Sequence, residues 1–303
     1  MIYELCIIGG GAIGGILTYY LFRGGLTDII VYYGSRESVE SISREGGLNI
    51  VYGGKEYFVP INPRYYKEPY GKCEYLINAV KAYNVPDTID LMKKISLLDT
   101  LILMIQNGFG SLEYVEERFK NLGVAGGVVF IGAERVSRTK IVYHGGETIF
   151  AGCRRNICSK LFELAHYFKR GGCDFRLTCD LDFYRWIKMA VNSVINPLTA
   201  IARAKNNIVL SRPGIELAEM ILSELVIVAK KYGYNLDREK LLNIVLRNAR
   251  NTSENYSSMV QDVLRGRKTE IDYINGFIAR ELGREDSINN IITKIIHLIE
   301  ELI

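Results

Sequence analysis

The stretch Tyr3–Phe22, YELCIIGGGAIGGILTYYLF, decides the fold of the amino-terminal half. Its first six residues are an apolar run typical of a buried strand, and the residues from Ala12 onward follow a helical pattern. Between them, Gly9, Gly11 and Gly14 form the pattern G-x-G-x-x-G. The first glycine permits a tight turn, the second lets backbone N–H groups approach a pyrophosphate, and the third lets helix and strand pack closely. Because the pattern lies between a strand and a helix, it predicts a dinucleotide site rather than a plain glycine turn.

The residues after the second predicted strand bear on which dinucleotide binds. Asp28–Tyr33, DIIVYY, has the character of that strand. Proteins specific for NAD usually end it with Asp or Glu, which holds the ribose hydroxyls. Here Ser35 and Arg36 follow instead, and a hydroxyl with a guanidinium suits a 2′-phosphate. We therefore predict NADPH, with NADH possible; the alternative is that Arg36 is only a solvated loop cation.

Apolar runs that end in polar residues continue this alternation of strands and helices as far as residue 177. Tyr75–Val80 ends at Lys81, and Leu101–Ile105 precedes the loop that holds Asn107. Ligands bind just beyond the carboxyl ends of the strands in open α/β sheets. Lys81 is therefore a candidate for cofactor phosphate or ribose, and Asn107 for the nicotinamide–substrate junction, although either could be a turn-former. Further strands are predicted within 46–59, 127–134, 141–144, 148–151 and 173–177, with helices opening at 85 and over 156–170.

The carboxyl-terminal half is predicted to be helical, with Trp186–Ala200, WIKMAVNSVINPLTA, as its central helix. On a helix Lys188, Asn192 and Asn196 share one stripe, because they recur every four residues. The other sides are apolar, so the helix is buried and the stripe needs a polar cavity. We expect Pro197 to stop or kink this helix. The alternative is a core helix whose lysine reaches the surface and whose asparagines bond to loops.

A second polar segment is Asn255–Gly283, NYSSMVQDVLRGRKTEIDYINGFIARELG. Ser258 and Asp262 share one face of a predicted helix. Thr269 is predicted to cap the next helix, with Glu270 in its first turn. An acid at this place is often only a charge-favoured cap, so the local pattern leaves the role of Glu270 open. Amphipathic helices are also predicted over 215–232, 238–250 and 288–303.

Length and composition fit two domains, which we place at 1–177 and 178–303. The chain is 48% hydrophobic and 24% charged, which is a globular profile. A net charge of +4 without tails of like charge indicates neither nucleic acid nor a membrane surface as partner. No apolar run approaches a membrane span and the start lacks the basic residues of a signal peptide, so we expect a cytoplasmic protein. The apolar surface of the helical domain suggests a homodimer.

The cysteines are scattered along the chain. In a cytosolic protein we expect free thiols, although disulfides are possible if the source organism is a hyperthermophile. The spacings Cys153-x4-Cys158 and Cys173-x5-Cys179 are wider than those of zinc knuckles, so no metal site is predicted.

These motifs, in this order, resemble those of the ketopantoate reductases (2-dehydropantoate 2-reductases). The matching segments are GGGAIG, VKAYNV, QNGFG, WIKMAVNSVINPLTAI and NYSSMVQD…GRKTEIDYINGF, and they span nearly the whole chain. The resemblance implies a Rossmann-type α/β domain followed by an all-helical domain, with the active site in the cleft between them. It also implies NADPH-dependent reduction of 2-dehydropantoate to (R)-pantoate, a step of pantothenate and coenzyme A biosynthesis.

The resemblance assigns roles position by position. Lys188 takes the place of the catalytic lysine, and Glu270 that of an active-site glutamate. Positions associated with the substrate are matched by Asn107, Lys188, Asn192, Asn196, Ser258 and Asp262. Cofactor positions are matched by Gly9, Gly11, Ala12, Ile13, Gly14, Ser35, Arg36, Lys81, Asn107 and Glu270.

Reduction of a 2-keto acid needs a hydride, which nicotinamide supplies, and a proton for the carbonyl oxygen. A cation beside that oxygen stabilises the charge that grows there, and Lys188 can also donate the proton. Glu270 would pair with the substrate's 4-hydroxyl or with Lys188. Two alternatives stay open: a related dehydrogenase for another 2-keto acid or a 3-hydroxy acid, and a nucleotide-sensing regulator without catalysis.

Overall fold

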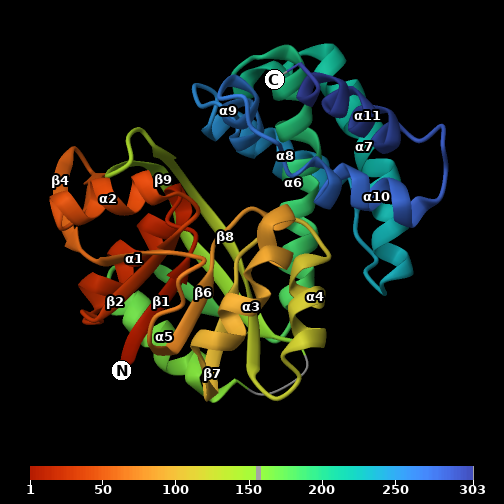
Figure 1. Cartoon of the computed structure of the whole chain (residues 1–303). Helices are drawn as coiled ribbons and strands as arrows, with labels where there is room; N and C mark the ends of the chain where they lie inside the picture. The colour runs from red at the N-terminus through yellow and green to blue at the C-terminus, as the bar shows by residue number, and fades with distance from the viewer. Residues whose placement is uncertain (155–157, 303) are drawn as a thin grey trace. The chain divides into compact units, whose positions relative to one another are not determined.

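The computed structural model describes residues 1–154 and 158–302, which divide into two compact units (Figure 1). One unit comprises Met1–Gln106 and Gly110–Leu181, and the other Asn107–Phe109 and Asp182–Ile303. The division therefore falls after Leu181 rather than after residue 177. Thr178 and Leu181 still belong to the first unit because they pack against glycines of its sheet.

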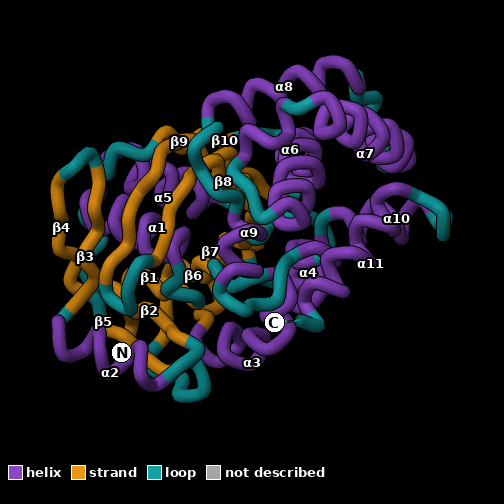
Figure 2. Tube along the Cα trace, turned by 90° about the horizontal axis from the view of Figure 1, so that it is seen from above, coloured by secondary structure: helices purple, strands orange, loops and turns teal. Residues whose placement is uncertain are grey.

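The strands of the first unit form a single sheet of ten within the described residues (orange in Figure 2). They are β1 (Ile2–Ile8), β2 (Ile29–Tyr33), β3 (Gly47–Tyr52), β4 (Lys55–Pro60), β5 (Asn62–Tyr65), β6 (Lys72–Asn78), β7 (Ser96–Met104), β8 (Gly123–Arg135), β9 (Lys140–Cys153) and β10 (Asp174–Leu177). The segment ordered β5-β2-β1-β6-β7-β8 is parallel throughout. That order is the doubly wound topology of dinucleotide-binding domains, with its switch point between β1 and β6.

The remaining strands extend this sheet beyond β8 in the order β9-β3-β4, with β10 beside β9. Strands β3 and β4 account for the strands predicted within 46–59 and form an antiparallel hairpin. The strands predicted separately over 141–144 and 148–151 are one strand, β9. It stays continuous because the similarly long β8 pairs with it from Ala125 to Arg135.

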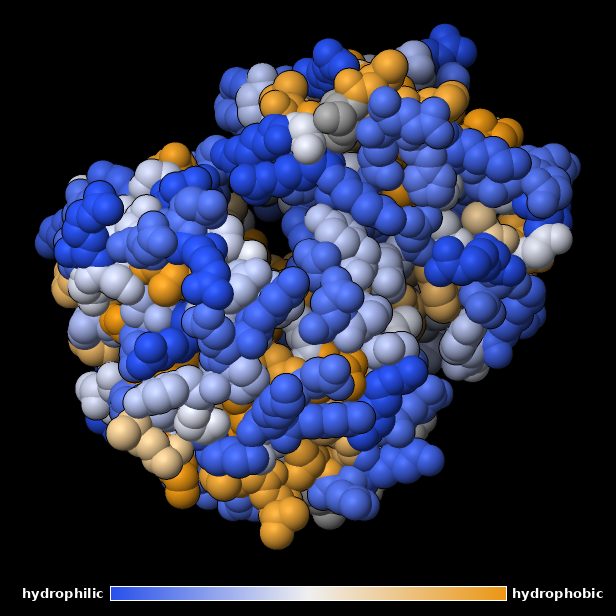
Figure 3. Space-filling model, in the orientation of Figure 1, coloured by the Kyte–Doolittle hydropathy of each residue, from blue (hydrophilic) through white to orange (hydrophobic). Residues whose placement is uncertain are grey.

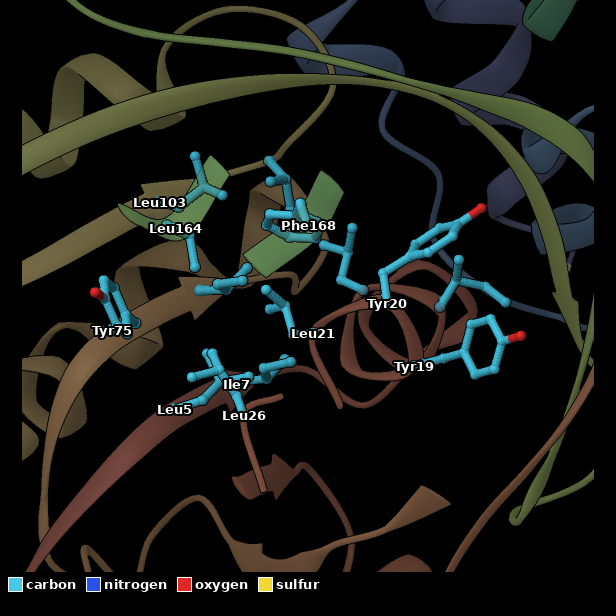
Figure 4. Close-up of a cluster of buried hydrophobic side chains, with 14 of the residues drawn as sticks. Leu5, Ile7, Tyr19, Tyr20, Leu21, Leu26, Tyr75, Leu103, Leu164 and Phe168 are labelled. Atoms are coloured by element: carbon cyan, nitrogen blue, oxygen red, sulfur yellow. The ribbon is translucent and has the colours of Figure 1, made fainter. Parts of the chain in front are cut away.

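Two helices cover one face of the sheet and form the core of the first unit. The helices of this unit are α1 (Ala12–Gly24), α2 (Arg36–Glu45), α3 (Val85–Ile95), α4 (Ser111–Arg118) and α5 (Ser159–Arg170). Leu5 and Ile7 of β1 meet Leu21 of α1 and Leu164 and Phe168 of α5 in this core (Figure 4). Helix α3 packs against β6 on the opposite face. Helix α5 was predicted to begin at Asn156, which lies outside the described residues.

The second unit is helical. Its helices are α6 (Leu181–Ala202), α7 (Arg212–Lys231), α8 (Arg238–Asn251), α9 (Ser258–Leu264), α10 (Asn275–Leu282) and α11 (Ile288–Glu300), with short 3-10 turns at η2 (Asn206–Leu210) and η3 (Ile271–Tyr273). Their apolar sides surround a core that includes Trp186 and Leu225. An α/β Rossmann-type domain followed by an all-helical domain is thereby confirmed as the fold class.

Two predictions about helix ends are wrong. Helix α6 does not stop at Pro197 but continues to Ala202, so of the expected stop or kink the stop is wrong. Thr269 does not cap a regular helix: its Oγ1 accepts from the N–H of Ile271, and the 3-10 turn η3 follows Glu270. Helix α10 begins only at Asn275. In both places contacts with other helices override the local pattern.

The expectation of free thiols is wrong for four of the cysteines, all six of which lie in the described parts of the chain. Cys6 and Cys73 form a disulfide, as do Cys153 and Cys158. The first bridge forms because β1 and β6 are neighbouring strands, which bring residues 67 apart to a Cα–Cα distance of 5.8 Å. Cys173, which is buried, and Cys179, which is exposed, are free.

Hydrophilic residues cover most of the face shown in Figure 3. Within the described ranges, every helix is too short or too polar to pass through a lipid bilayer. The same residues contain no group of three or more His, Cys, Asp or Glu side chains that could hold a metal ion.

Candidate active site and cofactor loop

The three glycines of the amino-terminal motif have different surroundings. Gly9 has φ +103°, and a Cβ there would lie 2.7 Å from the carbonyl carbon of Ala79. A Cβ on Gly14 would lie 2.1 Å from the carbonyl oxygen of Gly9. A Cβ on Gly11 would meet no described atom within 4 Å. The fold itself requires Gly9 and Gly14, whereas Gly11 leaves open space that fits the close approach of a phosphate.

The amino terminus of α1 is suited to an anion. Ala12 and Ile13 form its first turn, where backbone N–H groups have no partner inside the helix. No acidic residue lies in this turn, and Gly11 provides no side-chain cap. The helix dipole and these N–H groups can therefore act on a bound pyrophosphate.

Ser35 and Arg36 lie at the carboxyl end of β2, where α2 begins. The Ser35 hydroxyl caps α2 by accepting from the N–H of Ser38 at 3.3 Å. The guanidinium of Arg36 is exposed, lies 2.6 Å from the carboxylate of Glu68, and stands over the ring of Tyr65 at 4.8 Å. A phosphate bound by Arg36 would share this guanidinium with Glu68.

Lys81 lies beyond the carboxyl end of β6, where it precedes the 3-10 turn η1 (Ala82–Asn84) and is half-buried. Gln106, which the sequence analysis did not select, ties the ends of β6 and β7 together. Its Nε2 donates to the backbone oxygen and to Oδ1 of Asn78, both at 2.9 Å. A glutamine placed directly after a strand and before Asn107 is the signal that could have found it.

Asn107, Asn192 and Glu270 form a hydrogen-bonded cluster in the second unit. The Nδ2 of Asn107 donates to Oε2 of Glu270 at 2.9 Å, and the Nδ2 of Asn192 donates to Oδ1 of Asn107 at 3.4 Å. Glu270 is only 6% exposed. A carboxylate only accepts hydrogen bonds, so it fixes the orientation of the Asn107 amide and leaves its oxygen for Asn192. Residues 163 positions apart are thus brought together.

Lys188 lies one helical turn before Asn192 and interacts electrostatically with Glu270. Burial lowers the pKa of Lys188 to about 8, and the Glu270 carboxylate opposes this by favouring the charged form. An amine with such a pKa is still mostly protonated at neutral pH and can both lose and regain a proton. A proton donor, a carboxylate and two amides therefore share one polar cluster in a unit whose core is apolar.

Phe109 holds the Asn107 loop in the second unit. Its ring lies 4.5 Å from the ring of Trp186 and 5.0 Å from that of Phe277, between centroids. The guanidinium of Arg185 lies over the Phe109 ring, 4.1 Å from its centroid. The backbone N–H of Phe109 donates to the carbonyl of Tyr273 at 3.2 Å. Sequence reasoning missed Phe109 and Arg185, because a single aromatic residue and a single arginine carry no spacing signal.

The other predicted substrate residues are placed less centrally. Asn196 is buried on α6, and within the described residues no hydrogen bond joins its side chain to Asn107 or Glu270. Ser258 is exposed at the start of α9, whose cap is Ser257. Asp262 is buried on the same helix.

A Rossmann unit with an open glycine loop, together with a helical unit that holds a half-buried lysine beside a glutamate and two asparagines, defines a pyridine-nucleotide-dependent oxidoreductase. Sequence comparison gives the family. The model of the family described as "Ketopantoate reductase PanE/ApbA" matches residues 5–156, and that of its carboxyl-terminal domain matches residues 180–300. The chain belongs to the ketopantoate reductase family and is an oxidoreductase.

One relative agrees with this assignment, and two solved structures share the fold. The chain is 31% identical to the 2-dehydropantoate 2-reductase of Pyrobaculum aerophilum, over 98% of both proteins. Its fold matches a ternary structure of D-mandelate dehydrogenase with NADH and anilino(oxo)acetate at a TM-score of 0.91 and 22% identity, over 100% of this chain and 99% of the other. It also matches a structure of a PanE/ApbA family ketopantoate reductase from Ralstonia eutropha at a TM-score of 0.88 and 22% identity, over 100% of this chain and 99% of the other.

Proposed function

We propose that this protein reduces 2-dehydropantoate (ketopantoate) to (R)-pantoate with NADPH, as a step of pantothenate and coenzyme A biosynthesis in the cytoplasm. The observation that carries the proposal is the cluster of Asn107, Asn192 and Glu270 beside Lys188. These are the positions that resemblance to the family assigns to catalysis and substrate binding. The Pyrobaculum aerophilum relative, which has the name of this reaction, matches the chain over nearly its whole length.

The cofactor would be held by residues of the first unit. The N–H groups of Ala12 and Ile13, beside the open position at Gly11, would bind its pyrophosphate. Ser35 and Arg36 would bind the 2′-phosphate of NADPH. Lys81 would contact the rest of the dinucleotide, and so would Asn107, which belongs to the second unit. When bound, the nicotinamide supplies the hydride that reduces C2 of the keto acid.

Lys188 would act on the carbonyl oxygen of the substrate. Negative charge grows on this oxygen as C2 is reduced, so the ammonium stabilises the transition state more than the ground state. Lys188 then donates a proton to the oxygen, which completes the alcohol, and regains a proton from solvent. Asn192, Asn196, Ser258 and Asp262 would hold the carboxylate and hydroxyl groups of the substrate.

Glu270 would have two effects. Its carboxylate favours the protonated form of Lys188, which is the form the reaction consumes. It can also accept a hydrogen bond from the 4-hydroxyl of ketopantoate, a group that simple 2-keto acids lack. Because simple 2-keto acids cannot make this contact, it would favour ketopantoate over such acids.

The test is the fall in NADPH absorbance with ketopantoate, compared with NADH and with a panel of other 2-keto acids that includes an aryl keto acid. We expect the highest kcat/KM with ketopantoate and NADPH. The Lys188→Ala variant should lower kcat about a hundredfold or more, which is the usual scale for loss of an acid or oxyanion donor. A higher kcat/KM with another keto acid, or near-normal turnover without the lysine, would contradict the proposal.

The proposal includes a homodimer. Apolar side chains are exposed along α7 and α11 of the second unit, among them Met220, Ile227, Ile291 and Leu298. Burying them between two copies would remove this apolar surface from water. Sedimentation of the purified protein measures the association directly.

A further inference from the structure

Pro197 leaves one carbonyl group of α6 without its usual donor. In an α-helix the N–H of each residue donates to the carbonyl four positions earlier, and proline has no N–H. The carbonyl concerned belongs to Ser193, which is fully buried. The Nδ2 of Asn275, at the start of α10, donates to this carbonyl at 2.9 Å. A side chain of another helix therefore replaces the missing donor, and α6 continues without a break to Ala202.

The Asn275 amide is itself oriented by a chain of buried hydrogen bonds. Its second N–H donates to Oδ1 of Asn289 at 2.9 Å, and the Nδ2 of Asn289 donates to Oε2 of Glu224 at 2.7 Å. The Glu224 carboxylate can only accept, so it sets the orientation of Asn289, which in turn sets that of Asn275. Glu224 also accepts from the N–H groups of Ile288 and Asn289. The direction of every bond is thus fixed from the carboxylate of α7 to the carbonyl of α6.

This arrangement carries a cost in stability. Asn275 and Asn289 are fully buried, and the Oδ1 of Asn275 has no hydrogen-bond partner in the part of the chain that the structure describes. An apolar residue at 275 would avoid that unpaired oxygen. The asparagine provides a donor directed at the Ser193 carbonyl, which an apolar residue could not provide.

The bond joins the same two segments that meet in the proposed active site. Ser193 follows Asn192 directly, and Asn275 comes five residues after Glu270. Asn192 and Glu270 are joined through Asn107, and one residue further along α6 the segments are joined again by the Asn275 bond. Two successive connections limit rotation of α6 about its axis and bending at Pro197, where helices otherwise kink.

We propose that Asn275 is a positioning residue, which fixes the stripe of α6 that carries Lys188 and Asn192 relative to Glu270 by donating to the carbonyl that Pro197 leaves open. The proposal rests on the proposed function for its kinetic consequence. Nothing in the proposed chemistry requires Asn275 to contact substrate or cofactor.

The test is a double-mutant cycle of Asn275→Leu with Pro197→Ala, measured as ketopantoate reduction. Alone, Asn275→Leu should lower kcat about tenfold or more, the scale seen when an orienting partner of a functional group is lost, while KM for NADPH stays within about twofold. In the Pro197→Ala background, the alanine N–H can donate to Ser193, so the same substitution should lower kcat by less than about threefold. The alkaline limb of the pH profile should move to lower pH only in the single variant, as Lys188 loses the support of Glu270.

Asn290→Leu is the matched control, because Asn290 lies next to Asn289 on α11 but donates to the carbonyl of Glu285 at 2.8 Å. It should leave kcat unchanged. Equal losses from Asn275→Leu in both backgrounds, or an unchanged kcat in the folded single variant, would overturn the proposal. If the leucine variant is unfolded at the assay temperature by circular dichroism, Asn275→Ala replaces it in the same cycle.

Amide hydrogen exchange separates this proposal from the proposed function. Asn275→Leu alone should speed exchange of the backbone N–H groups of α6 around residue 193 at least tenfold. The same substitution combined with Pro197→Ala should speed it much less. This result would support the helix-fixing bond even if ketopantoate proved not to be the substrate. Unchanged exchange would reject the bond's role whatever the substrate is.

Discussion

Lys188 carries its charge in surroundings that disfavour it. Burial lowers its pKa from 10.5 to about 8, and Glu270 prevents a larger fall. The lysine itself was predictable from its spacing with Asn192 and Asn196. The pKa was not, because it depends on a carboxylate 82 positions away in the sequence (270 − 188) and on atoms that the fold packs around the amine.

The pH dependence of kcat/KM should report this environment. The reaction uses protonated Lys188, so kcat/KM for ketopantoate should be constant below about pH 8 and fall tenfold per pH unit above it, since this parameter reflects the free enzyme. Glu270→Gln removes the charge that raises the pKa of Lys188, so the fall should begin at lower pH. If kcat/KM of the Glu270→Gln variant begins to fall at the same pH as that of the wild type, a group other than Lys188 controls the fall.

The glycines of the amino-terminal loop should separate into two classes by mutation. Gly11→Ala places a methyl group where no atom of the described residues lies within 4 Å, so stability should stay within about 0.5 kcal/mol while Kd for NADPH rises. Gly14→Ala forces a methyl group to within 2.1 Å of a carbonyl oxygen, so its melting temperature should fall. Calorimetric titration with NADPH and thermal denaturation measure the two effects; unchanged affinity in the Gly11 variant would remove that position from the cofactor site.

At the scale of single elements, segments governed by local chemistry were predicted and those governed by distant contacts were not. Strand β1, the glycine turn and α1 follow one another as the sequence indicates. Helix α6 passes through Pro197, and there Asn275 donates to the Ser193 carbonyl from another helix. The 3-10 turn after Glu270 likewise has no local signal. Both failures lie beside the candidate site, where long-range bonds replace helical ones.

The loop 107–109 is the element whose attachment is most directly testable. Phe109 is 5% exposed among aromatic rings, so Phe109→Ala should lower the free energy of unfolding by about 3 kcal/mol or more. Phe162→Ala on α5 is the control, because its side chain is 65% exposed, and should change stability by less than about 0.5 kcal/mol. Urea titration followed by tryptophan fluorescence measures both, since the only tryptophan, Trp186, contacts Phe109. Equal effects would show that the ring does not anchor the loop.

At the scale of the whole molecule, the order of the two domains was predicted from the change in pattern along the chain. The disulfides were not, because pairing depends on which strands become neighbours. Cys6 and Cys73 meet only because β6 returns beside β1. The three-residue exception to the domain division was not predictable either, because the residues NGF at 107–109 give no sign that they pack with helices.

The two disulfides should differ in their contribution to stability. They join residues 67 and 5 positions apart, so in the chain-entropy picture their loss costs about 4 and about 2 kcal/mol respectively. Replacing Cys6 and Cys73 by alanine should therefore lower the free energy of unfolding more than replacing Cys153 and Cys158. Thiol titration of the denatured wild-type protein should give two free thiols; six would show that neither bridge forms in solution.

The grouping of Asn107–Phe109 with the helices has a consequence for exchanging halves between members of this family. A chimera spliced at Leu181 would receive a foreign set of helices yet keep its parental Phe109, and the aromatic slot formed by Trp186 and Phe277 would no longer match its occupant. Grafting three residues from the donor of the helices along with them would restore the fit. The unit that must be exchanged as a whole is therefore discontinuous in sequence. Among members of the family, the residues at 107–109 should vary together with those of the helical half rather than with those of the strands next to them in sequence.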